Sequence, residues 1–234
     1  MKKYFYLPLC ILSLQNATAQ INLVPNPSFE DTVYCPTGKN QLNASEHWLN
    51  FGNSPDYYNA CSNPAFGVPN SNQGFQYAHT GNAYVGAVFF YRSNSPVGPN
   101  YREPIGIALT SNLIIGQKYY VSFFAVNAAV NIVSIACDKL GINFYTLPFD
   151  SCCPPPLLNT SKLYTDSILI DTLTWIKISG SFIAHSAYQY LCISNFFNDA
   201  NTDTLSTAPF PSYAYYYIDD VCVSTYSLYN DTWT

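Results

Sequence analysis

Short runs of aromatic and β-branched residues recur along this chain, and clusters of Asn, Gly, Pro and Ser separate them. Such runs predict strands, and helix signals are almost absent. We expect strands near residues 21–24, 29–34, 82–91, 103–110, 117–127, 139–147, 173–183, 187–197 and 213–224. Without helical crossovers between the strands, the pattern predicts an all-β protein, an antiparallel β-sandwich.

The first nineteen residues look like a secretory signal peptide. Lys2 and Lys3 precede a short apolar run, and Ala17-Thr18-Ala19 forms a cleavage site of the A-x-A type. We therefore expect a secreted or cell-surface protein with one β-sandwich domain over residues 20–225 and a polar tail or linker over 226–234. No later segment is long and apolar enough to span a membrane.

The charge of the mature chain limits its partners. The chain has 9 Lys and Arg and 14 Asp and Glu, and loss of Lys2 and Lys3 leaves 7 basic against 14 acidic residues, a net charge of −7. An acidic surface disfavours nucleic acid and anionic membranes, and it suits neutral ligands or cations.

Seven cysteines remain after the leader, and in an exported protein they predict disulfides. Cys35 and Cys61 both lie in segments rich in Pro, Asn and Gly, and they are the first expected pair. Because seven is odd, we expect one thiol that is free or bonded to another molecule. No CxxC motif occurs and histidines are few, so a zinc site is not expected.

Five short motifs follow one another in a recognisable order. They are "NLVPNPSFED" (22–31), "HTGNAYVG" (79–86), "LIIGQKYYVSFFA" (113–125), "WIKISGSFIAHSAYQYLCI" (175–193) and "YYYIDDVCVS" (215–224). Together they resemble the markers of carbohydrate-binding modules of the family 4/9 type, and a set of exported Bacteroidetes surface proteins begins in a similar way. The resemblance implies a galactose-binding-like jelly roll.

Two adjacent carboxylates, Asp219 and Asp220, lie in the last expected strand. Neighbouring strand residues point to opposite faces, so both can turn the same way only if the strand bulges. A buried carboxylate needs a partner. One interpretation is an Asp that caps a loop amide or pairs with Lys118 or Arg102.

The resemblance implies a different partner for these acids, a structural calcium ion that joins the first and last strands. Its carboxylate ligands would be Glu30 and Asp219, with Asp220 as the alternative. Carbonyl oxygens near Ser28 and around His79 to Asn82 would complete the set of six to eight oxygens that calcium prefers.

The sequence offers no clear catalytic constellation, and we expect no enzyme activity. None of the three histidines lies in a known nucleophile context. Glycoside hydrolysis needs two carboxylates across a sugar cleft. Glu46, Asp56 and Glu103 could pair in principle, but nothing in the sequence singles them out.

Aromatic residues make up 17% of the chain, and 21 of them are tyrosines. Flat rings stack on the C–H face of a sugar, and polar side chains bind its hydroxyls. The long segment 35–81, which we expect to be ordered, is the candidate platform. The candidate contacts are Trp48, Tyr57, Tyr58, Asn59, Gln76, Tyr77 and Tyr101. For any single tyrosine, burial in the core remains the commoner role.

Two functions follow from these observations. The first is an exported, non-catalytic module that binds a glycan through surface aromatics. The second is a cell-surface structural or adhesion module that binds a protein partner, as in proteins exported by type IX secretion. A groove lined by aromatics favours the first, and a flat sheet with only buried aromatics favours the second.

Overall fold

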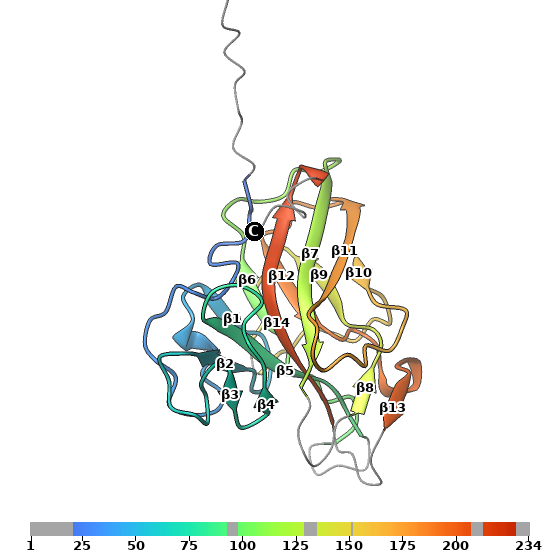
Figure 1. Cartoon of the computed structure of the whole chain (residues 1–234). Helices are drawn as coiled ribbons and strands as arrows, with labels where there is room; N and C mark the ends of the chain where they lie inside the picture. The colour runs from blue at the N-terminus through green and yellow to red at the C-terminus, as the bar shows by residue number, and fades with distance from the viewer. Residues whose placement is uncertain (1–20, 93–97, 129–134, 151, 207–212, 228–234) are drawn as a thin grey trace, which may run out of the picture.

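The computed structural model describes residues 21–92, 98–128, 135–150, 152–206 and 213–227, and two antiparallel five-stranded sheets dominate it (Figure 1). The front sheet has the order β11 (Ile176–Ile183), β7 (Lys118–Asn127), β14 (Tyr213–Ser224), β5 (Ala83–Tyr91) and β2 (Asp56–Asn59). The back sheet has the order β1 (Trp48–Asn50), β6 (Ile105–Ala108), β12 (Tyr190–Ser194), β9 (Gly141–Tyr145) and β10 (Leu163–Tyr164).

Short elements complete the described fold. Two small sheets pair β8 (Ile135–Cys137) with β13 (Thr204–Ser206) and β3 (Asn70–Ser71) with β4 (Gly74–Phe75). Two 3-10 turns occur, η1 (Leu42–Ala44) and η2 (Asp199–Asn201). Within the described residues, no helix is long and apolar enough to cross a membrane.

Successive long strands alternate between the two sheets. β5 lies in the front sheet, β6 in the back, β7 in the front, β9 in the back, β11 in the front, β12 in the back and β14 in the front. This alternation is the connectivity of a jelly roll, in which the chain repeatedly crosses from one sheet to the other. The predicted antiparallel β-sandwich is confirmed.

The main core lies between the sheets because side chains alternate along each strand. From β7 it takes Tyr119, Val121, Phe123 and Ala125, and Ile107, Ile142 and Ile193 face them from the back sheet. The residues between these positions point outward and build separate aromatic layers on the two outer faces.

Seven of the nine expected segments contain a strand of a main sheet, and the two at the start of the chain do not. Residues 21–24 and 29–34 are irregular because Pro25 and Pro27 have no N–H to donate and Phe29 has a φ of 63°. The two ends of the domain still meet. The amide of Leu23 donates to the carbonyl of Val223 at 2.8 Å, and that of Val221 donates to Pro27 at 2.9 Å.

The segment 35–81 is ordered, as expected, but it also supplies strands that the sequence did not reveal: β1, β2, β3 and β4. The disulfide between Cys35 and Cys61 is confirmed, with a Cα–Cα distance of 5.8 Å. The expectation of one leftover thiol is wrong, because five described cysteines are unpaired: Cys137, Cys152, Cys153, Cys192 and Cys222. The expected leader and most of the expected tail lie outside the described residues.

Candidate binding pocket on the front sheet

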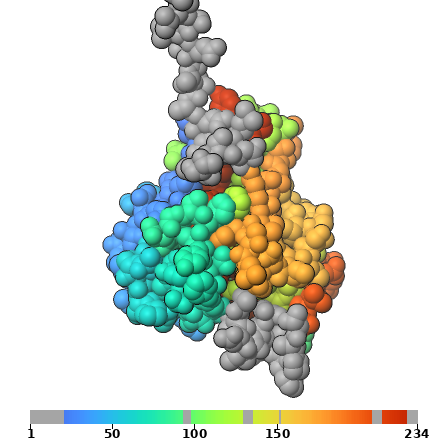
Figure 2. Space-filling view, viewed as in Figure 1, coloured from blue at the N-terminus to red at the C-terminus, as the bar shows by residue number. Residues whose placement is uncertain are grey.

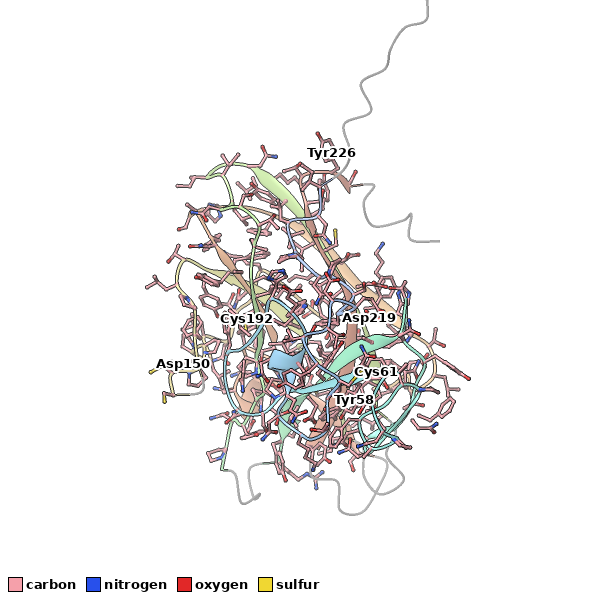
Figure 3. The ribbon with its side chains drawn as sticks, turned by 90° about the vertical axis from the view of Figure 1, so that its left-hand side faces the viewer. Tyr58, Cys61, Asp150, Cys192, Asp219 and Tyr226 are labelled. Carbon is pink, nitrogen blue, oxygen red and sulfur yellow. A yellow bond between two sulfur atoms is a disulfide. The ribbon has the colours of Figure 1, made fainter. Side chains whose placement is uncertain are left out.

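An aromatic layer covers the outer face of the front sheet. Tyr58, Tyr84, Tyr215 and Tyr217 form it, and Trp175 packs against it. Figure 2 shows the N-terminal half of the chain, blue to green, covering one side of the molecule beside the orange segment that includes β11. Figure 3 places Tyr58 and Asp219 on one side of the sandwich and Cys192 on the other.

The sequence-predicted platform is not assembled on the surface. Trp48 is 2% exposed, and its indole N–H donates to the carbonyl of Asn26 at 2.9 Å. Tyr57 and Tyr58 are fully buried, and the Tyr57 hydroxyl donates to the carbonyl of Phe29 at 2.9 Å. These three rings have no open face for a ligand, and this part of the expectation is corrected.

The expected polar anchors are also occupied within the protein. Asn59 is buried and donates to the Tyr57 hydroxyl at 2.8 Å. Gln76 is buried and donates to the carbonyl of Leu173 at 3.4 Å. Tyr77 is 66% exposed and packs edge-on against Phe75. Asn59 and Gln76 are therefore engaged within the protein, whereas Tyr77 lies on the surface.

The seventh expected residue, Tyr101, lines a different site, which we call the tyrosine pocket. It is a cavity of about 160 Å³ on the outer face of the front sheet. Its buried floor consists of Asp56, Gln73, Val88, Glu103 and Tyr215. Its rim consists of half-buried Ser54, Tyr91, Tyr101 and Tyr213 and of exposed Lys39 and Asn40.

Asp56, the first residue of β2, anchors one side of the floor. Its Oδ2 accepts a hydrogen bond from Tyr215 at 2.8 Å, and its Oδ1 accepts one from the amide of Asn40 at 2.8 Å. Burial raises the pKa of this carboxyl above its ordinary value, although these hydrogen bonds and nearby Lys39 oppose the rise. Asp56 is thus a fixed acceptor at the base of the cavity.

Glu103, just before β6, anchors the other side. Its Oε2 accepts a hydrogen bond from the amide of Val88 at 2.8 Å. Val88 lies on β5, past the last residue that pairs with β2. Its Oε1 accepts from Ser54 at 2.7 Å and from Tyr101 at 3.0 Å. Burial raises the pKa of Glu103, and the charge of Asp56 adds to the rise, so the two carboxylates are electrostatic neighbours.

The tyrosine rings of the pocket pack against one another, Tyr91 edge-on against Tyr101 and at a shallow tilt against Tyr213. The ring centroids of Tyr91 and Tyr101 are 5.7 Å apart, and those of Tyr91 and Tyr213 are 5.5 Å apart. Such separations are typical of favourable aromatic pairs. Burial raises the pKa of Tyr101 to about 12, so its hydroxyl keeps its proton at neutral pH.

A glycine on β5 makes room for the floor. A Cβ atom at Gly86 would lie 2.5 Å from the ring and hydroxyl of Tyr215. The Tyr215 ring therefore lies against the backbone of the neighbouring strand, and from there its hydroxyl reaches Asp56. Any side chain at position 86 would displace this ring.

A second group of carboxylates lies where the two ends of the domain meet, and we call it the clasp. Asp219 pairs with Phe124 and Cys222 pairs with Ser122, so Asp220 and Val221 together oppose one residue of β7. Asp220 has a φ of 47°. This is the β-bulge that the paired acids require to turn the same way, and both are buried.

The buried acids of the clasp bind the loop that precedes β5. Asp219 Oδ2 accepts from the amides of His79 at 2.9 Å and Thr80 at 3.2 Å. Asp220 accepts from the Thr80 hydroxyl at 2.7 Å and contacts the His79 ring. Burial, then the charge of Asp220, raises the pKa of Asp219 well above its ordinary value.

Glu30 completes the clasp from the start of the chain. Its Oε1 accepts from the amides of Asn82 at 2.8 Å and Ala83 at 2.9 Å. Gly81 has a φ of 66°, and a Cβ atom there would lie 2.3 Å from the Glu30 carboxyl carbon. Glu30 therefore occupies the space that this glycine leaves open.

These contacts bear on the expected calcium ion. The oxygens of Glu30, Asp219 and Asp220 face N–H and O–H donors, which is the loop-capping arrangement. Arg102 pairs instead with Asp199, and Lys118 lies over the ring of Tyr120. Among the described residues, no group of three or more His, Cys, Asp or Glu is placed to hold a metal. The three carboxylates are thus held by donors of the protein itself, and the calcium ion stays a prediction from the resemblance.

Most of the tyrosine pocket was not predicted from the sequence. Tyr101 was predicted as a ligand contact, and Asp56 and Glu103 as acids that could pair, but Tyr91 and Tyr213 were not predicted. One signal was available: β14 carries tyrosines at alternate positions on its outward face. The partner segments from β2 and from before β6 are far away in the sequence, so only the fold brings them together.

No family model matches the sequence, and no curated protein matches it. Several solved structures are similar. The CBM22-1 xylan-binding domain from Paenibacillus barcinonensis Xyn10C is 13% identical over 84% of this chain and 90% of that chain, with a TM-score of 0.42. A putative sugar binding protein from Bacteroides thetaiotaomicron is 11% identical over 87% and 99%, with a TM-score of 0.43.

A third similar structure is an adhesin. The K1 cleaved adhesin domain of Lys-gingipain from Porphyromonas gingivalis is 15% identical over 84% of this chain and 95% of that chain, with a TM-score of 0.39.

Proposed function

We propose that this chain is an exported, non-catalytic module that binds a glycan in the tyrosine pocket. The observation that carries the proposal is the combination of half-buried tyrosine rings at the rim with buried, fixed hydrogen-bond acceptors at the floor. Rings offer flat apolar surface for sugar C–H groups, and fixed acceptors orient hydroxyls.

The size of the pocket limits how much ligand it holds. At about 160 Å³ it is smaller than the roughly 300 to 1,000 Å³ of sites for drug-sized molecules. It therefore suits a single sugar ring, with the rest of the glycan outside. Asp56 and Glu103 each accept hydrogen bonds on both carboxyl oxygens, which suits an acceptor that holds a ligand rather than one that transfers protons.

Export is part of the proposal. The disulfide between Cys35 and Cys61 supports it, because disulfides persist in oxidising compartments. The leader-like residues 1–19 support it from the sequence.

The test is a glycan array followed by calorimetry on the glycans that bind. We expect Tyr213→Ala and Tyr101→Ala to weaken binding about tenfold or more, equal to about 1.4 kcal/mol. Tyr77→Ala is the matched control, because Tyr77 is an exposed tyrosine that does not line the pocket. If no glycan binds, or if Tyr77→Ala has the same effect as Tyr213→Ala, the proposal is wrong.

One observation favours the alternative, a cell-surface module that binds a protein. An apolar groove of about 420 Å³ lies beside Ile176 at the start of the edge strand β11, and Leu169 and Ile170 line it. An extended apolar segment of a surface protein could add to such an edge. A blank array, together with a partner lost on Ile170→Asp but retained on Tyr213→Ala, would favour this function.

A further inference from the structure

The direction of the hydrogen bonds in the tyrosine pocket indicates which class of sugar it binds. The inference rests on the proposed function, that the pocket binds a glycan. We propose that the pocket prefers a sugar with a protonated amino group, of the 2-amino-2-deoxyhexose class, over the same sugar with a hydroxyl or an acetamido group.

Several hydroxyl protons of the pocket are already directed at its own walls. Tyr215 donates to Asp56, and Tyr101 and Ser54 donate to Glu103. Tyr213 donates to the Gln73 side-chain oxygen at 3.3 Å. These groups turn oxygen lone pairs rather than protons toward a ligand. A ligand therefore has to bring donors, and an ammonium group brings three.

The charges of the pocket also favour a cationic ligand. Two carboxylates, Asp56 and Glu103, line it, and Lys39 is the cation among the lining residues. Both carboxylates are at most 5% exposed, and the charge of one raises the pKa of the other. A cation bound between them stabilises both in the ionised form, whereas a neutral sugar leaves their repulsion in place.

The rings at the rim suit a cation as well. Tyr91, Tyr101 and Tyr213 are half-buried and lie around the opening. The negative faces of aromatic rings attract an ammonium group within about 6 Å. An acetamido group would lose both the charge and two donors, and it needs more room than the small cavity offers.

The experiment compares three oligosaccharides of equal length: glucosamine oligomers, N-acetylglucosamine oligomers and cello-oligosaccharides. They are titrated into the mature chain at pH 6, where the amine is protonated, at low and high salt. We expect the amino sugar to bind at least tenfold more tightly than the other two, and this preference to shrink with salt. Glu103→Gln keeps an acceptor without the charge, and it should remove most of the preference.

An acidic protein can attract a cationic oligosaccharide without a site, so a matched variant is needed. Asp166→Asn removes the same charge from a side chain that is 78% exposed and does not line the pocket. We expect this variant to keep the preference. If Asp166→Asn and Glu103→Gln weaken binding equally, the inference is overturned. Should Glu103→Gln not fold, as judged by its melting curve, Asp56→Asn replaces it.

The outcomes separate this inference from the proposed function. If neutral and amino sugars bind equally and Tyr213→Ala abolishes both, the glycan module stands and the amino preference is wrong. If none of the three binds and the array is blank, the proposed function fails, and the inference fails with it.

Discussion

The clasp and the tyrosine pocket lie on the same front sheet and both use acidic residues, but the acids have different partners. In the clasp, Glu30 and Asp219 accept hydrogen bonds from backbone amides of residues 79–83. In the pocket, Asp56 and Glu103 accept mainly from tyrosine and serine hydroxyls beside an open cavity.

The difference teaches how to distinguish a structural acid from a binding acid. A carboxylate that accepts several main-chain amides fixes a loop, and its oxygens are occupied whatever the ligand. A carboxylate that accepts from side-chain hydroxyls beside a cavity instead orients those hydroxyls around the cavity. Substitutions in the clasp should therefore change stability, and substitutions in the pocket should mainly change binding.

The largest expected effect is at Asp219. Asp219→Ala leaves the part-buried amides of His79 and Thr80 and the buried amide of Asp220 without their acceptor. Each unsatisfied buried group costs about 1 to 3 kcal/mol, so we expect a loss of about 3 kcal/mol or more in the free energy of unfolding. Urea unfolding measures it. Asp219→Asn keeps one acceptor oxygen, and at pH 7 it should lose clearly less.

The pH dependence of stability, compared between the wild type and Asp219→Asn, tests the same buried carboxyl. Because burial raises the pKa of Asp219 above its ordinary 3.8, the folded state binds more protons than the unfolded state as the pH rises from that value. The contribution of this group to stability therefore falls with rising pH. Relative to the wild type, Asp219→Asn should become more stable as the pH increases above about 4. A constant difference across pH would contradict the buried-acid interpretation.

An intermediate effect is expected at Gly81. Gly81→Ala forces a Cβ into the space of the Glu30 carboxylate and strains a positive φ, for a loss of about 2 kcal/mol. Gly116→Ala is the matched control, because Gly116 has a φ of 83° and open space around it. It should lose about 1 kcal/mol. In a Glu30→Ala background the two glycine substitutions should cost the same, and a persistent difference would show that Glu30 is not the cause.

The smallest effect distinguishes an amide clasp from a calcium site. Gln at position 30 can still accept from the amides of Asn82 and Ala83, so Glu30→Gln should cost about 0.5 kcal/mol. If these amides alone hold the clasp, EDTA leaves the melting temperature unchanged. A melting temperature that EDTA lowers in the wild type but not in Glu30→Gln would establish the calcium ion that the resemblance implies.

The sequence predicted the long strands because each has enough residues to show its pattern. The expected segments 21–24 and 29–34 failed where Pro25, Pro27 and the positive φ of Phe29 outweighed strand-forming neighbours. Strands of two or three residues, such as β10 and β13, are too short to show a period, and the sequence did not reveal them.

The site was less predictable than the fold. Composition showed that tyrosines are abundant, but which of them face outward depends on register, and Tyr57 and Tyr58 are neighbours buried in different layers. The adjacency of Asp219 and Asp220 did predict a bulge as the condition for a shared face. The meeting of Asp56 with Glu103 depends on the crossing of the chain between sheets, and no local pattern encodes it.

The bonds between the first and last segments have a mechanical consequence. The amide of Leu23 binds Val223 and the carbonyl of Pro27 binds the amide of Val221, so the two segments run in opposite directions. Tension applied to residues 21 and 224 would load these hydrogen bonds one after another, starting with the bond between Leu23 and Val223. The ends would part at low force, while the disulfide at Cys61 and the two sheets further inside stay intact.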